Sequence, residues 1–328
     1  FVQNLNKGNM EGLTMSIDKQ IYNLVRRGIM PTLQGGIGGG PITINSEGAI
    51  MRQGVGREFF VAGNWGSDSN EGDSWDAPFL TLAAAITANN ADVAADKYGW
   101  ATRNRIYLSA DTTTETLVAF PNKCDVIGVG SYDANDMPGI TGNHAPVNAG
   151  NYGTRFYNIF FHGAAVAGPI VTLASTSSGI QFIGCVFDAP VSGTTNTRAI
   201  LATASPFLKV INCTFRGPFS ADYITFGTGE AGGTQIVGNL MQDGADNGIM
   251  IGAGTTASWR GLIMGNLIQC ADKFIDTQST SVFNVVDNVC ISGEALGASS
   301  YVIDLTYAVG NRVTGNGVSA TIPVIPAA

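Results

Sequence analysis

The sequence predicts an all-β fold, a right-handed single-stranded parallel β-helix, with a short helical anchor segment before it and a capping helix at its start. Two observations carry this prediction. The chain has 43 Gly and 12 Pro among 328 residues and only 13% charged residues, a composition typical of short strands joined by many turns. A short pattern also recurs every 22 to 28 residues, and such self-similarity indicates a solenoid.

The repeat reads apolar, any residue, Asn or Cys, any residue, apolar. Equivalent residues of stacked coils lie about 4.8 Å apart, so they form columns along the axis. Two buried apolar columns are predicted, one starting at Phe156 and Ile183 and the other at Phe160 and Phe187. The central residues are predicted to form a structural ladder between these columns. They are Asn158, Cys185, Cys213, Asn239, Asn266, Asn288 and Asn311.

The chain is predicted to have three parts: an N-terminal attachment segment over residues 1–57, the β-helix over 58–320 and a C-terminal tail over 321–328. The first part contains a short amphipathic helix over 16–28 and a glycine-rich hinge at 34–41. A helix this short is marginal alone, so we expect it to pack against another subunit or a larger assembly. The alternative is an ordinary N-terminal subdomain within one chain.

The first coil of a solenoid exposes its core and a strand edge, and the segment over 58–89 supplies a cover. It reads as a strand, a Gly66-Ser-Asp-Ser-Asn-Glu-Gly72 turn, Trp75, and Pro78-Phe79 before a helix predicted over 77–88. We expect Leu80 and Ala84 of this helix to face the end of the solenoid. The segment resembles the opening of pectate-lyase-like β-helix proteins, and with the repeats the resemblance covers residues 58–315.

The order of anchor helix, hinge and stiff solenoid resembles that of bacteriophage tailspikes, fibres and head-decoration proteins, which are commonly homotrimers. The resemblance implies a place on the virion surface or outside the cell. It also implies a homotrimer, contacts with other virion proteins through residues 1–57, and a surface polysaccharide as a possible ligand.

Charge and motifs exclude several other classes. The net charge of −8 and the scattered Lys and Arg residues disfavour nucleic acid and anionic membranes as partners. No motif indicates a cofactor. Asp68, Asn70 and Asp73 alternate as calcium ligands do, but the loop lacks the distal Glu of a calcium site. We therefore favour a turn rich in Asp and Asn, and no metal.

Carboxylates in consecutive coils are the candidates for chemistry, because glycoside hydrolysis needs two carboxyl groups close together. They are Glu230, Asp243, Asp246, Asp272 and Asp276. Trp259 and Arg260 lie among them and are candidate glycan contacts. Solvated turn acids and a packing tryptophan are the alternative interpretation.

The sparse ionisable groups favour a structural or receptor-facing appendage over an enzyme. A polysaccharide depolymerase of the glycoside hydrolase type is the alternative function. A bacterial surface adhesin or filament subunit is a further one.

Overall fold

The computed structural model describes residues 56–95, 99–130, 137–146, 151–174, 177–190, 196–245, 247–252, 254–256, 260–271, 274–277, 283–292, 307–315 and 318–321. The chain divides into two units between Val55 and Gly56. The predicted anchor helix and glycine hinge lie outside the described residues. Among the described residues, no helix combines the length and apolar character needed to cross a membrane.

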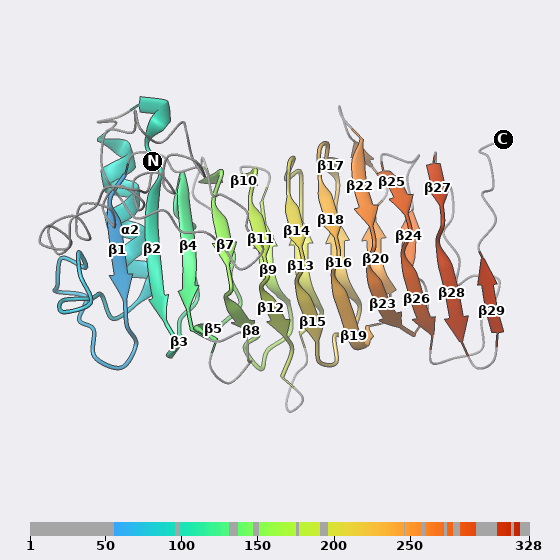
Figure 1. Ribbon diagram of the computed structural model, residues 1–328, viewed down its shortest axis with the longest axis horizontal. Helices are drawn as coiled ribbons and strands as arrows, with labels where there is room; N and C mark the ends of the chain where they lie inside the picture. Colours follow the sequence, from blue (N-terminus) through green and yellow to red (C-terminus); the bar gives the residue numbers. More distant parts are fainter. Residues whose placement is uncertain are drawn as a thin grey trace, which may run out of the picture. The chain divides into compact units, whose positions relative to one another are not determined.

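The unit that begins at Gly56 is a right-handed parallel β-helix, which confirms the predicted fold (Figure 1). Each complete coil contributes one strand to each of three parallel sheets. The first sheet contains β1 (Glu58–Val61), β2 (Asn104–Ser109), β4 (Cys124–Val129), β7 (Arg155–Tyr157), β11 (Gln181–Ile183), β14 (Lys209–Ile211), β18 (Gln235–Val237), β22 (Gly261–Met264), β25 (Phe283–Val286) and β27 (Tyr307–Val309).

The second sheet contains β3 (Thr112–Thr114), β5 (Gly139–Thr141), β8 (Phe160–His162), β12 (Val186–Asp188), β15 (Thr214–Arg216), β19 (Leu240–Ala245), β23 (Leu267–Cys270), β26 (Val289–Ser292), β28 (Arg312–Gly315) and β29 (Val318–Thr321). Its last strand, β29, runs antiparallel to β28. The third sheet contains β9 (Pro169–Leu173), β13 (Arg198–Ala202), β16 (Asp222–Phe226), β20 (Asn247–Ile251) and β24 (Ile275–Thr277). Two short pairs join neighbouring coils: β6 (Asn151–Tyr152) with β10 (Ser177–Ser178), and β17 (Gly229–Glu230) with β21 (Thr255–Thr256).

The start of the β-helix is packed against α2 (Leu82–Ala94), which is followed by a 3₁₀ turn, η3 (Gly99–Ala101). The helix begins later than predicted, and Leu80 is exposed while Leu82, Ala85 and Ile86 are buried. Glu115, in the turn after β3, accepts hydrogen bonds from the backbone N–H groups of the first two helical residues. A carboxylate at this position satisfies two donors that a helix leaves open and complements the helix dipole.

Asp68 also serves the start of α2, since its carboxylate accepts hydrogen bonds from Leu80 N, Thr81 N and the Thr81 hydroxyl, each at 2.9 Å. The Asn70 side chain donates to the carbonyl of Pro78 at 2.8 Å. Two of the three candidate calcium ligands are therefore engaged in holding the turn. The expectation of no metal at Asp68, Asn70 and Asp73 stays a prediction.

A two-residue corner joins the first sheet to the second in each coil from β7 onward. Its first residue has a positive φ, from 52° to 70°, a conformation that suits Gly, Asn and Asp. These residues are Asn158, Gly184, Asn212, Gly238, Gly265, Asp287 and Gly310. The second residue of the corner points inward and carries the ladder.

The hydrogen bonds of the predicted asparagine ladder are present from Asn239 to Asn311. The backbone N–H and the Nδ2 group of Asn266 both donate to Oδ1 of Asn288, at 3.0 and 2.8 Å. The same Nδ2 group donates to the carbonyl of Ile236 at 2.9 Å. Asn239 and Asn288 repeat this arrangement with the next asparagine along the axis.

Cysteine replaces asparagine in two coils of the ladder. The thiols of Cys185 and Cys213 lie 3.5 and 3.4 Å from the carbonyls of Phe156 and Phe182, the positions that Asn Nδ2 contacts elsewhere. All five cysteines of the chain are buried and free.

The predicted columns need two corrections. Asn158 is not a ladder residue, because the register aligns it with Gly184 and places Ile159 beside Cys185. The predicted apolar column of the first sheet is also displaced by one residue, since Ile183 and its equivalents are half-buried on the outer face. The inward column is Phe156, Phe182, Val210, Ile236, Ile263 and Val285.

The inward column of the second sheet follows the prediction, except that it starts at Phe161 and not at Phe160. Three phenylalanines stack in this column. The rings of Phe161 and Phe187 have centroids 5.2 Å apart, and those of Phe187 and Phe215 4.9 Å apart. Stacked apolar columns of this kind form one continuous core through the coils.

We predict that Asn266→Ala lowers the free energy of unfolding by about 2–4 kcal/mol, because buried donors and acceptors left unpaired cost about 1–3 kcal/mol each. The substitution leaves the Asn239 N–H and the Ile236 carbonyl without their partners. Urea denaturation followed by circular dichroism measures the change. Gln235→Ala is the matched control, an amide side chain that lies half-buried on the outer face of β18. Equal losses in the two variants would contradict the role of the ladder.

Candidate functional site

Long connections flank the outer face of the third sheet. From β7 onward the corner between the first and second sheets has two residues, whereas the connections on either side of the third sheet reach nine residues, over 189–197 and 252–260. Loops on a rigid scaffold are the usual carriers of binding and catalytic residues. The third sheet is therefore the face whose surroundings can vary while the coil is maintained.

The described candidate residues lie on this sheet or next to it. Asp276 is part of β24 and is 5% exposed, and Glu230 is part of β17, in the connection that follows β16. Asp243 is exposed in a bulge of β19 that leads toward β20, and has a φ of 73°. Arg260 is exposed at the end of the connection from β20 to β22. Asp246, Trp259 and Asp272 lie outside the described residues.

The structure does not bring these described residues into one contact network. The Glu230 carboxylate accepts a hydrogen bond from Gly232 N at 2.8 Å and so stabilises its own turn. Asp276 is a partner of other groups within the core of the sheet. Their assignment as catalytic residues, like that of Arg260 as a glycan contact, stays a prediction.

A polar network that the sequence did not reveal lies at the start of three consecutive strands of the third sheet. Arg198, Asp222 and Asn247 are in register on β13, β16 and β20. Asp222 is 2% exposed in its side chain although it belongs to the outer face. A buried carboxylate is stable only when donors compensate for its lost hydration, and the neighbouring coils supply these donors.

Three side chains donate to the Asp222 carboxylate. Its Oδ2 lies 3.1 Å from Arg198 Nε and 2.7 Å from the Thr225 hydroxyl, and its Oδ1 lies 2.9 Å from Asn247 Nδ2. Arg198 Nε also donates to the Thr225 oxygen at 2.7 Å. The guanidinium is thus fixed through its Nε edge only, and the described residues offer no acceptor to its two terminal nitrogens.

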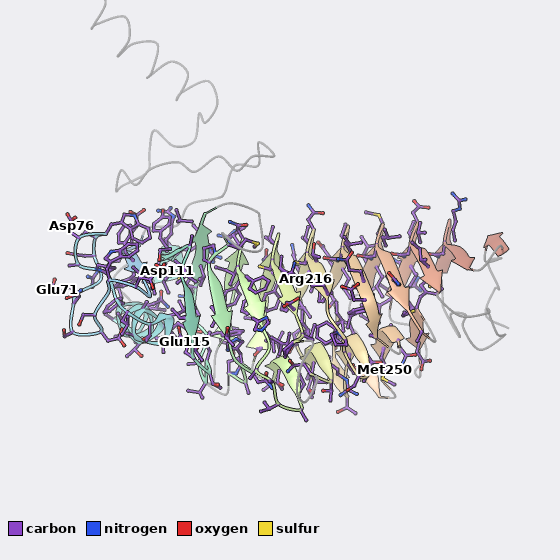
Figure 2. All side chains as sticks on the ribbon, turned by 90° about the horizontal axis from the view of Figure 1, so that it is seen from below. Glu71, Asp76, Asp111, Glu115, Arg216 and Met250 are labelled. Atoms are coloured by element: carbon purple, nitrogen blue, oxygen red, sulfur yellow. The ribbon has the colours of Figure 1, made fainter. Side chains whose placement is uncertain are left out.

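The arrangement presents a positioned guanidinium beside an outer face of mixed character. The Arg198 side chain is 29% exposed. The second outward row of the same face contains Thr172, Leu201 and Met250, all half-buried. Met250 is labelled in Figure 2. A planar cation with free donors binds carboxylate and other oxygen-rich groups, and apolar side chains beside it accommodate the carbon skeleton of a ligand.

The geometry argues against Asp222 and Asp276 as a hydrolytic pair. Asp276 is aligned with Thr225 across β20, so the two acids are two strands and three residues apart. Ideal sheet spacing converts this to about 14 Å between Cα atoms. Glycosidases hold their two carboxyl groups about 5–9.5 Å apart. The separation of the two backbones and the three donors already bound to Asp222 disfavour this pair as hydrolytic acids.

Sequence reasoning missed the network because it searched for acids close to aromatic residues. The signal was a polar residue at the start of three consecutive strands of the third sheet, at positions 198, 222 and 247. Polar residues that recur once per coil lie next to one another in the sheet, so opposite charges at such positions predict an ion pair between coils.

Comparisons with known proteins give similarity of architecture. No protein-family model matches the chain, and no curated protein matches it. Among solved structures, the pectate lyase Pel9A is similar at 15% identity and a TM-score of 0.49, over 79% of this chain and 74% of that one. The pectin methylesterase from Aspergillus niger is similar at 16% identity and a TM-score of 0.44, over 83% of this chain and 94% of that one.

A double mutant of the tailspike protein of E. coli bacteriophage HK620, in complex with a pentasaccharide, is similar at 12% identity and a TM-score of 0.34. The match covers 66% of this chain and 47% of the tailspike chain. At such identities the residues of this chain alone have to decide its function.

We predict that Asp222→Ala lowers the free energy of unfolding by about 1–3 kcal/mol, because the Thr225 hydroxyl and the Asn247 amide lose this acceptor, whereas the partly exposed Arg198 can be hydrated. Asp76→Ala is the control, and as an exposed residue of the segment before α2 it should change stability by no more than about 0.5 kcal/mol. Thermal and urea denaturation measure both. A loss for Asp222→Ala as small as that of the control would show that the network contributes little to the fold.

Proposed function

We propose that this chain is a carbohydrate-binding β-helix and that the outer face of the third sheet is its binding surface. The observation that carries the proposal is the network of Arg198, Asp222, Thr225 and Asn247, which fixes a guanidinium by one edge and leaves its terminal nitrogens available. The connections on either side of the third sheet differ in length from coil to coil.

The chemistry of the face suits a sugar chain. Sugars present hydroxyl groups at the edge of each ring and C–H groups on its faces. Arg198 supplies donors at the start of the strands, while Leu201 and Met250 supply apolar contact one row further along. A ligand that lies along the axis meets equivalent positions about every 4.8 Å, so consecutive coils can contact consecutive sugars.

We further propose that the β-helix is the receptor-facing part of a virion appendage, a tailspike, fibre or capsid decoration. In this proposal residues 1–57 attach a homotrimer to other virion proteins, and the β-helix faces a surface polysaccharide of the host. The support is the predicted anchor helix and glycine hinge, together with the division of the chain between Val55 and Gly56.

The binding proposal is tested on an array of bacterial surface polysaccharides with the full-length chain. We expect binding to at least one of them, and Arg198→Gln should weaken it about tenfold, equivalent to roughly 1.4 kcal/mol. Arg312→Gln is the matched control, because Arg312 is exposed on β28 of the second sheet. Release of reducing ends, measured on the same polysaccharides, separates binding from depolymerase activity. Binding that is equal in the two variants would place the site elsewhere.

The appendage proposal predicts a closed trimer of the full-length chain in light scattering and electron microscopy. Deletion of residues 1–55 should abolish attachment to the virion body. The circular dichroism of the shortened chain should retain the β-helix signal, because the described coils and their cover begin at Gly56. A full-length chain that is monomeric at micromolar concentration would overturn the proposal.

A further inference from the structure

A row of three ionisable side chains crosses the outer face of the second sheet, away from the face proposed to bind carbohydrate. His162, Asp188 and Arg216 are in register on β8, β12 and β15, which are consecutive strands. Their side chains are 32%, 18% and 33% exposed. Arg216 lies near the middle of the β-helix in Figure 2.

Asp188 fixes both of its neighbours. Its Oδ2 lies 2.9 Å from Nδ1 of His162, and its Oδ1 lies 2.7 Å from Nε of Arg216. Because a carboxylate only accepts, Nδ1 of the imidazole must be the protonated nitrogen of this contact. The other ring nitrogen, Nε2, then carries a lone pair when the imidazole is neutral.

The Phe160 ring contacts both the imidazole of His162 and the guanidinium of Arg216. Its ring is stacked on the His162 ring, with centroids 5.8 Å apart and planes inclined by 14°. The Arg216 guanidinium lies over the same ring at 5.2 Å from its centroid. The imidazole and the guanidinium are therefore held near one another around one phenylalanine, although their strands are two coils apart.

The groups that Asp188 leaves over have complementary properties. Within the described part of the chain, neither the terminal nitrogens of Arg216 nor Nε2 of His162 has a hydrogen-bond partner. The terminal nitrogens of Arg216 are paired donors that match the two oxygens of a carboxylate, and Nε2 of His162 is an acceptor for a hydroxyl group.

We propose that His162, Asp188 and Arg216 form a binding site for a hydroxycarboxylate, an acidic sugar in the setting of a glycan. Arg216 binds the carboxylate of the ligand, His162 Nε2 accepts from a neighbouring hydroxyl, and Asp188 positions both. Holding strands together does not require this composition, since a cross-strand pair contributes only about 0.2–1 kcal/mol and can be built from many residue types.

The experiment titrates the full-length, isotope-labelled protein with sodium galacturonate at constant pH and follows the imidazole resonances of His162 by NMR. We expect a saturable shift of these resonances. The methyl ester of galacturonate has the same hydroxyl groups and no charge, and should give no saturable shift. His144 is an internal reference, because it is 1% exposed on the inner side of the coils.

Arg216→Gln should weaken the binding of galacturonate about tenfold, equivalent to roughly 1.4 kcal/mol, while Arg312→Gln should leave it unchanged. Absence of a saturable shift in the wild type would overturn the proposal. An equal response to the methyl ester, or an unchanged affinity in Arg216→Gln, would do the same. The site on the third sheet is unaffected by these outcomes, because Arg198→Gln alters it independently.

Discussion

The corner between the first and second sheets is the constraint on which the rest of the molecule depends. One corner residue takes a left-handed conformation, and the next turns its side chain inward to bind the backbone of the adjoining coils. An asparagine there both donates and accepts along the axis, so each coil can take only one register on the coil before it. Between Asn239 and Asn311 the inward apolar residues follow that register. The coils before them, with Ile159, Cys185 and Cys213 at the corner, continue it with stacked phenylalanines.

The same register organises the outer faces. When coils are aligned, a charged side chain has its nearest neighbours on the coils above and below, and not along its own strand. Asp222 and Asp188 each use this arrangement to hold an arginine from a neighbouring coil. In both cases the carboxylate takes the Nε edge of the guanidinium and leaves the other edge available. The stacking of the coils thus positions two arginine side chains, one on the outer face of the third sheet and one on that of the second.

The sequence predicted the architecture and the strands but not all of the columns. Asparagine suits both residues of the corner, because it tolerates a left-handed backbone and can also form the ladder. Asn158 was therefore assigned to the second corner residue, the ladder position, although it is the first. The apolar residues just before the corner misled in the same way. Ile183 and Ile211 face outward, where a polar residue would have marked the outer face.

The polar networks were harder to predict for a different reason. Arg198 and Asp222 are 24 residues apart, and only the exact length of each coil makes them neighbours. An error of one residue in the assumed register, such as the one made at Asn158, separates every pair of this kind. Residues whose roles depend on register therefore need the structure, while residues that alternate within one strand do not.

The ladder also sets how this chain can change its length. A coil pairs with the coils before and after it, and from β7 onward its corner has the same two-residue length. Growth or loss can then occur in whole coils, or in the connections beside the third sheet, which leave the corner intact. The length of the β-helix is thereby a multiple of the height of one coil. Its proposed binding face can be altered by insertions in the connections without disturbing the stacking of the coils.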